Sequence, residues 1–203
     1  MKYKLIRKNP ENQPASGHYN DWKPQICEEC YRQCVYCAIQ DNHWGGIDNF
    51  HIDHFRPKSR AEFAHLVDDI MNLFYSCPVC NRFKSNDWPA NPNVAEPSYL
   101  DPSVTDYDSI FETDEFFIHG KNVAARYIAV RLFLNRPQLI FERREATLKN
   151  QENDLFAYVL NKLPELEDKE LLRKASSLLG KVKEHLNSRD KIQPYKLSEI
   201  RKK

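Results

Sequence analysis

Apolar and polar residues follow different periods in the two halves of the chain. Residues 50–55 alternate aromatic or β-branched side chains with polar ones, which predicts a strand. Pro57 ends it, because proline cannot continue the hydrogen-bond ladder of a central strand. Shorter apolar clusters predict a short helix over residues 24–33, a helical turn over 61–66, and another short helix that ends near Lys84.

The pattern becomes helical only after a long loop. Four prolines make a loop of residues 85–107, and residues 109–119 predict two short strands. An apolar stripe then runs through 123–134, and two long amphipathic segments follow over 136–163 and 164–186. We therefore expect short strands and helices in the first half of the chain and helices in the second.

Composition limits the class of protein. The 203 residues have a mass of 24.0 kDa, with 41% hydrophobic and 29% charged residues, which is enough chain to bury a core in one or two domains. No run of eighteen apolar residues predicts a membrane span, and no apolar stretch follows the basic N-terminus, so we expect a cytoplasmic protein. Glycine is scarce, and neither G-x-G-x-x-G nor a P-loop occurs, which excludes those nucleotide-binding architectures.

The net charge of +1 hides an uneven distribution. Residues 85–120 hold eight carboxylates and no Lys or Arg, whereas residues 121–203 hold 19 basic and 11 acidic side chains. The basic helices are equally consistent with contacts to nucleic acid and with a solvated amphipathic bundle. We expect residues 85–203 to carry a surface for a partner.

The six cysteines form three C-x-x-C pairs, a spacing that favours metal over disulfides in a reducing compartment. Two of the pairs bracket the predicted strand and predict a closed, structural zinc site formed by Cys34, Cys37, Cys77 and Cys80. Buried free thiols are the simpler alternative, but two flanking pairs argue against it. Cys27 and Cys30 fit one face of a short helix, so we assign them to the core; replacement ligands or a second metal are the alternatives.

Between these two cysteine pairs, which we call the knuckles, lies a carboxylate beside a histidine, Asp53-His54. An Asp suits Mg²⁺, and a neutral His suits activation of water near pH 7. Asn81 follows the second knuckle and offers another oxygen ligand. Positive charge suited to a phosphodiester surrounds the pair, from Arg56, Lys58, Arg82 and Lys84.

These residues resemble the motif of the HNH endonucleases, which have the ββα-metal fold, in the subclass with zinc knuckles. The matching pattern is Cys34-Val35-Tyr36-Cys37, Asp53-His54-x-x-Pro57-x-Ser59, Asn72-Leu73, and Cys77-x-x-Cys80-Asn81-x-x-Lys84. It covers roughly residues 34–87. Several matches in order at compatible spacings make coincidence improbable.

The resemblance implies a role for each residue. His54 is expected to be the general base, and Asp53 and Asn81 to bind Mg²⁺ or Mn²⁺, with Asn81 standing where many members of the family have His. Asn72 is expected to hold the loop between strand and helix through hydrogen bonds, and Lys84 to approach a phosphate. The expected cofactors are therefore a structural zinc ion and a catalytic Mg²⁺ or Mn²⁺.

A second, less specific resemblance covers parts of the remaining chain. Leu100-Asp101-Pro102, the aromatic stretch 111–117 and residues 124–144 are similar to the C-terminal extension of some bacterial HNH nucleases. These include the nuclease subunits of Septu-type anti-phage defence systems, which work beside an ATPase. The implied partners are DNA and an ATPase.

Together these observations predict an α+β protein, with a zinc-stabilised ββα-metal nuclease module followed by a mainly helical C-terminal domain. The expected units are an N-terminal arm (1–23), the nuclease module with zinc knuckles (24–88), an acidic, proline-rich connection with short strands (89–121), and a helical domain with a basic tail (122–203). The expected reaction is metal-dependent hydrolysis of DNA. The alternatives are a zinc-knuckle binding module without activity, and an RNA-cleaving enzyme such as a tRNA nuclease.

Overall fold

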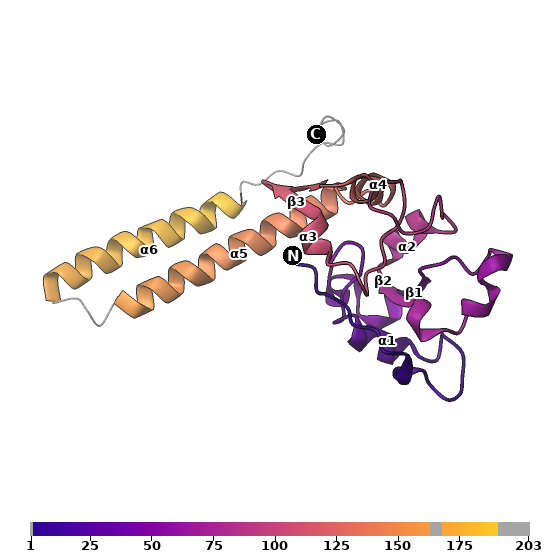
Figure 1. The fold of residues 1–203 in the computed structure, drawn as a ribbon. Helices are drawn as coiled ribbons and strands as arrows, with labels where there is room; N and C mark the ends of the chain where they lie inside the picture. The colour runs from indigo at the N-terminus through magenta and orange to yellow at the C-terminus, as the bar shows by residue number, and fades with distance from the viewer. Residues whose placement is uncertain (1, 163–167, 191–203) are drawn as a thin grey trace.

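The computed structural model describes residues 2–162 and 168–190. A compact body contains the first 140 or so residues, and two long helices project from it (Figure 1). The helices and strands are α1 (Lys23–Glu29), β1 (His51–His54), β2 (Leu73–Ser76), α2 (Pro78–Lys84), α3 (Tyr107–Ile110), β3 (Phe111–Asp114), β4 (Phe117–Gly120), α4 (Val123–Arg131), α5 (Pro137–Lys162) and α6 (Asp168–Asp190). Within the described residues, one short 3₁₀ helix precedes α1 and four lie between α1 and β2. The expected α+β class, a small mixed module followed by helices, is confirmed.

The centre of the body is the antiparallel pair β1–β2, followed directly by α2. The register pairs Asp53 with Phe74 and His54 with Leu73. Cys77 caps the N-terminus of α2, because its sulfur accepts a hydrogen bond from the backbone N–H of Cys80, and Pro78 occupies the first turn, where a missing N–H costs nothing. These elements form the two strands and one helix expected of the nuclease module.

The helix predicted over 24–33 is shorter in the structure. It ends at Glu29, because Tyr31 and Arg32 both adopt a φ of +56°, outside the helical region. The predicted turn over 61–66 is present as a 3₁₀ helix, and the two predicted strands of 109–119 are β3 and β4.

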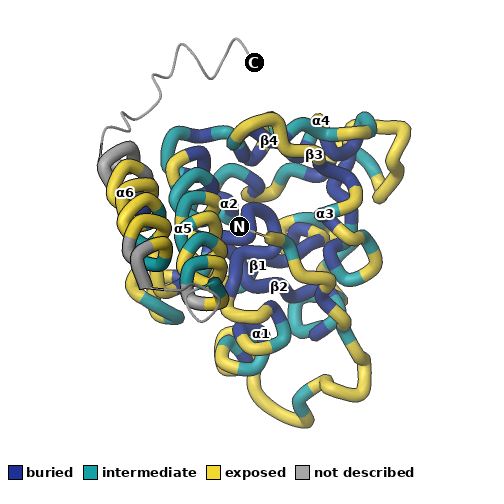
Figure 2. The backbone as a smooth tube through the Cα atoms, turned by 90° about the vertical axis from the view of Figure 1, so that its left-hand side faces the viewer, coloured by how far each residue is buried: buried dark blue, intermediate teal, exposed yellow. Residues whose placement is uncertain are grey.

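One continuous core joins the N-terminal segment, the central hairpin and part of the C-terminal helices (Figure 2). Ile6 is 1% exposed and belongs to this core, so the N-terminal segment packs against the body. Ala124, Ile128 and Leu134 belong to the same core. The segment after residue 122 therefore begins inside the body and leaves it only along α5.

The return from β4 into α4 requires glycine at position 120. A Cβ there would lie 2.2 Å from the backbone nitrogen of Arg126, well inside the contact distance of two non-bonded atoms. Asn122 then caps α4, with its Oδ1 accepting from the N–H of Ala125 at 2.8 Å. This tight corner packs α4 against β4, and the start of α5 then returns to the core, where Leu139 is buried.

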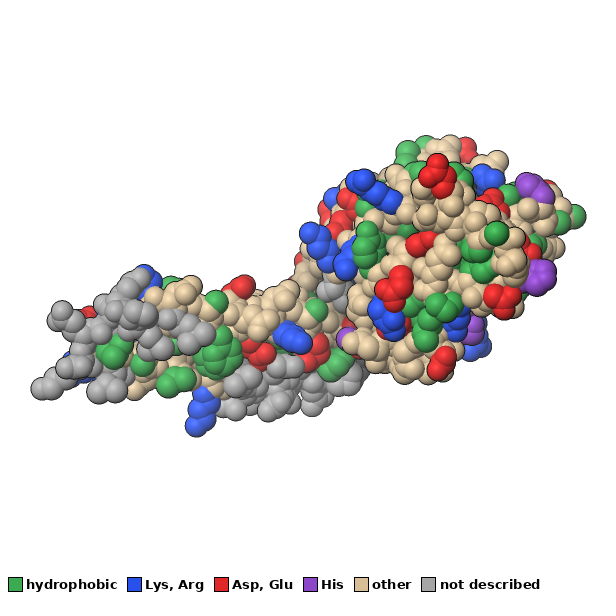
Figure 3. Space-filling model, turned by 90° about the horizontal axis from the view of Figure 1, so that it is seen from below, with side chains coloured by type: hydrophobic (Ala, Val, Ile, Leu, Met, Phe, Trp, Pro, Cys, Tyr) green, Lys and Arg blue, Asp and Glu red, His purple; other side chains and the backbone are tan. Residues whose placement is uncertain are grey.

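α5 and α6 form an antiparallel hairpin that extends away from the body (Figures 1 and 3). Hydrophobic side chains remain exposed along it, with Phe156 at 48%, Tyr158 at 53% and Leu179 at 60%. The predicted helix start at Pro164 and residues 191–203 of the predicted basic tail (187–203) lie outside the described residues, whereas residues 187–190 continue α6. No helix among residues 2–162 and 168–190 combines the length and apolarity needed to cross a bilayer.

Candidate active site and metal centre

The four cysteines of the two knuckles converge in the structure. The sulfur atoms of Cys34, Cys37, Cys77 and Cys80 all lie within 4.8 Å of one another, and each residue is at most 1% exposed. The Sγ atoms of Cys37 and Cys77 are 3.8 Å apart, which matches the edge of about 3.8 Å expected for a tetrahedron with Zn–S bonds of about 2.3 Å. The arrangement thus fits a closed zinc site.

A buried arginine from the C-terminal half lies against this cluster. The guanidinium of Arg136 donates to Cys37, Cys77 and Cys80 over distances of 3.6–3.7 Å, and the residue is 5% exposed. Burial alone would lower the pKa of Arg136, but the charges of the three cysteines raise it above its ordinary value. Four thiolates around Zn²⁺ carry a net charge of −2, which Arg136 partly offsets.

The third cysteine pair stays apart from the cluster. Cys27 and Cys30 are fully buried in the core, where desolvation raises the pKa of Cys27 and raises that of Cys30 to about 11. Cys27 donates to Asp41 at 3.6 Å. Within the described residues they belong to no group of metal-ligating side chains, so the interpretation as core residues agrees with the structure.

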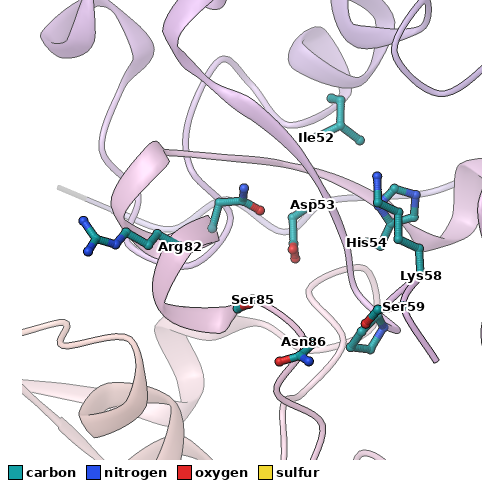
Figure 4. Close-up of a pocket in the computed structure, with 10 residues that line it drawn as sticks. Ile52, Asp53, His54, Lys58, Ser59, Arg82, Ser85 and Asn86 are labelled. Carbon is teal, nitrogen blue, oxygen red and sulfur yellow. The ribbon is translucent and has the colours of Figure 1, made fainter.

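A cavity of about 510 Å³ opens beside the central hairpin, between β1 and α2 (Figure 4). Its wall is formed by Ile52, Asp53, His54, Pro57, Lys58, Ser59, Asn81, Arg82, Ser85 and Asn86. Asp53 points into the middle of the labelled side chains, His54 and Lys58 lie beside each other, and Arg82 points away towards the rim (Figure 4). The structure therefore gathers residues far apart in the sequence at one opening.

His54 is oriented by the loop that follows β1. Its Nε2 lies 2.9 Å from the carbonyl oxygen of Val67, which can only accept, so Nε2 carries the proton and Nδ1 is left as the proton acceptor. The ring also packs edge-on against Tyr19, with centroids 4.7 Å apart. Burial lowers the pKa of His54 below its ordinary value; the Val67 bond opposes this and the charge of Lys58 adds to it. The imidazole is thus held neutral and oriented.

Asp53 is buried and held by two donors. The hydroxyl of Tyr36 donates to Oδ2 at 2.5 Å, and Nζ of Lys84 lies 3.1 Å from Oδ2 and 3.3 Å from Oδ1. Burial, and then the charge of Asp53, raise the pKa of Tyr36 well above its ordinary value, which keeps this hydroxyl protonated. A carboxylate offers about four acceptor positions, so Asp53 retains capacity for a cation.

Lys84 does not take the position that we expected from the sequence. It is 0% exposed, and its ammonium donates to the carbonyl of His54 at 2.7 Å as well as to Asp53. Because α2 packs against β1, this side chain reaches under the strand instead of out to a phosphate. Its positive charge therefore contacts the Asp53 carboxylate within the core.

Asn72 bonds to the backbone of the loop between β1 and β2. Its Oδ1 accepts from the N–H of Arg56 at 2.8 Å, and its Nδ2 donates to the carbonyls of Arg56 and Leu66 at 3.2 and 3.1 Å. The side chain is 5% exposed and uses both of its polar atoms on backbone groups. Its role is therefore to shape the loop whose Val67 carbonyl accepts the hydrogen bond from His54.

The three remaining basic residues are exposed around the opening. Lys58 and Arg82 line the cavity, and Lys58 donates to the hydroxyl of Tyr19 at 2.6 Å. Arg56 lies outside the cavity wall, over the ring of Phe63. Asn81 is half-buried in the wall, on the same side of α2 as Arg82.

Tyr36 and Arg136 are two of the contacts to the site that sequence reasoning missed. A tyrosine between two predicted zinc ligands was the only local signal for Tyr36. No signal marked Arg136, which lies 56 residues from Cys80.

Comparison with known protein families identifies the same segment as the sequence motif does. Residues 34–87 match the family model described as HNH endonuclease. No curated protein and no solved structure matches the chain. The family match covers both knuckles, Asp53, His54 and Asn81, so residues 34–87 are similar to an HNH endonuclease domain and contain a four-cysteine cluster suited to zinc. Such a domain supports nuclease activity in general, which implies contact with nucleic acid.

Proposed function

We propose that this protein is a metal-dependent endonuclease that hydrolyses phosphodiester bonds in DNA. The observation that carries the proposal is that one cavity brings an oriented, neutral His54 together with Asp53 and Asn81. An acid–base group and oxygen donors on one wall are what hydrolysis of a phosphodiester requires.

The oxygen donors of the cavity suit a hard divalent cation. Asp53 and Asn81 would hold Mg²⁺ or Mn²⁺, and the volume of about 510 Å³ leaves room for the waters that Mg²⁺ retains. When bound, the cation supplies stabilisation of the charge that develops on the phosphate and the leaving oxygen.

His54 acts on the attacking water. Because Nε2 donates to Val67, Nδ1 takes the proton, and the lowered pKa keeps the ring in its basic form near pH 7. Lys58 and Arg82 at the opening attract the phosphate backbone, and Asn72 keeps the loop around His54 in shape. The structural zinc ion, held by Cys34, Cys37, Cys77 and Cys80, would keep the two knuckles together on either side of the hairpin.

The test is cleavage of supercoiled plasmid by the full chain in Mg²⁺, in Mn²⁺ and in EDTA, with His54→Ala and Asp53→Asn beside it. His65→Ala is the matched control, because His65 is exposed on the nearby loop and lies outside the cavity. We expect nicking with the cations, none in EDTA, and wild-type activity only in the His65 control. Wild-type protein that binds plasmid without cutting it would favour the binding module instead.

A tRNA and a single-stranded DNA in the same assay separate DNA from RNA as the substrate. Cleavage of tRNA with an intact plasmid would favour the RNA-cleaving alternative. The role in anti-phage defence and the ATPase partner rest on the resemblance of residues 100–144. The exposed hydrophobic side chains of the α5–α6 hairpin are consistent with a protein partner, and co-purification of an ATPase from the native host would support it.

A further inference from the structure

A buried hydrogen bond connects the four-cysteine cluster to the candidate ligand of the catalytic cation. Tyr36 precedes Cys37 directly in the chain, and its hydroxyl donates to Oδ2 of Asp53 at 2.5 Å. Both residues are buried, with Tyr36 at 0% and Asp53 at 4% exposure. No water can replace this donor without a rearrangement of the core.

The knuckle that carries Tyr36 is fixed at several points. The N–H of Val35 donates to the carbonyl of Tyr75 in β2 at 3.0 Å, and the carbonyl of Tyr36 accepts from the hydroxyl of Tyr3 at 3.0 Å. Cys37 anchors the other side of the knuckle in the cluster. The hydroxyl of Tyr36 is therefore presented from a rigid frame and cannot follow Asp53 if the carboxylate turns.

The two donors on Asp53 do different things. Lys84 lies at similar distances from both carboxylate oxygens, so its ammonium supplies charge without choosing between them. Tyr36 contacts Oδ2 alone, at a shorter distance, and so fixes the rotation of the carboxylate group. The other oxygen is then left in a defined direction.

We propose that Tyr36, held in the knuckle beside the four-cysteine cluster, is a positioning residue for Asp53 and that its hydrogen bond raises the affinity of the site for its catalytic cation. The inference rests on the proposed function only in taking Asp53 as a cation ligand. Hydrogen-bond partners of ligating carboxylates orient the ligand, and their loss costs about 10–100-fold in metal affinity or activity.

The experiment measures cation binding directly, by titration of the full chain with Mn²⁺ followed by electron paramagnetic resonance, and then plasmid cleavage against Mg²⁺ concentration. Tyr36→Phe removes the hydroxyl and keeps the ring. Tyr107→Phe is the matched control, because that buried hydroxyl donates to the carbonyl of Leu100, away from the cavity.

We expect Tyr36→Phe to bind Mn²⁺ about 10–100-fold more weakly and to need correspondingly more Mg²⁺ for half-maximal cleavage, with its zinc content unchanged. In an Asp53→Asn background the same change should have no further effect on Mn²⁺ affinity. Tyr107→Phe should match the wild type in both measurements.

Equal Mn²⁺ affinity in Tyr36→Phe and wild type would overturn the inference. Loss of zinc or unfolding of Tyr36→Phe would also overturn it, since the tyrosine would then belong to the packing of the knuckle. A wild type that binds Mn²⁺ at Asp53 but cleaves no nucleic acid would remove the proposed function and leave the positioning role of Tyr36 to be decided by the binding data alone.

Discussion

Replacement of Arg136 by methionine should destabilise the four-cysteine cluster from outside its ligand set. The guanidinium is 5% exposed and donates to three of the four sulfurs. Methionine keeps much of the side-chain volume but removes the charge and every donor. The cluster would then keep a buried net charge of −2 with no arginine to offset it.

The distance from the Arg136 guanidinium to the cysteine sulfurs gives the size of the expected loss in stability. At 3.6 Å and an effective dielectric constant near 20, one pair of unit charges attracts by about 5 kcal/mol. The cost of burying the guanidinium offsets part of this, and removal of one partner from a buried pair costs about 3–5 kcal/mol in measured cases. For a chain of this size about 1 kcal/mol corresponds to 2–4 °C, so the melting temperature should fall by roughly 6–20 °C.

The assay pairs thermal unfolding with the rate of zinc release to a chromogenic chelator. Arg131→Met is the matched control, because Arg131 forms an exposed ion pair with Asp87, a class that contributes at most about 1 kcal/mol. Arg136→Lys should be intermediate, since one ammonium cannot donate to three sulfurs in the fork geometry of a guanidinium. Wild-type melting and wild-type zinc release in Arg136→Met would refute the reasoning.

Three further predictions concern the site and the hairpin. His54→Ala should slow plasmid cleavage by about 10²–10⁴-fold without loss of zinc. In the wild type, the acid limb of the pH–rate profile should lie below about pH 6.5, because burial lowers the pKa of this base. An acid limb above about pH 7 would contradict the assignment. Cys77→Ser should release zinc and unfold the N-terminal module, which circular dichroism and elemental analysis would detect, and a folded, zinc-loaded variant would exclude Cys77 as a ligand. Truncation after Lys149 should leave zinc content and cleavage intact, because Val182 is the only buried side chain among the described residues beyond it. The same truncation should abolish any complex with a partner protein. A truncated chain without zinc would show that the hairpin supports the body.

Local pattern was sufficient for much of the candidate site. Alternation over residues 50–55 located β1, and the C-x-x-C spacing identified the four cysteines that converge. In both cases the signal lies within a few residues of the feature, so backbone geometry and ligand chemistry set the outcome. The position of Asn72 between the strands also agreed with its hydrogen bonds to the loop.

The sequence did not predict how deeply each side chain of the site is buried. Lys84 follows Asn81 by one turn of α2, and the resemblance placed Asn81 at the cation and Lys84 near a phosphate. The structure puts Asn81 in the cavity wall and Lys84 beneath β1, because the tilt of α2 against the strand decides how far each side chain reaches. A buried lysine is stable there only because the carboxylate of Asp53 and the carbonyl of His54 receive its ammonium.

The sequence by itself determined the α+β class, the four-cysteine cluster and the gathering of Asp53, His54 and Asn81, because motifs of fixed spacing carry these features. Only the tertiary structure decided that Tyr36 holds Asp53 and that Arg136 covers the cluster. Both are contacts between segments far apart in the chain, whose meeting depends on how the knuckle packs on β2 and how the corner at Gly120 returns the chain. Packing of whole elements creates such contacts, and no local residue pattern records them.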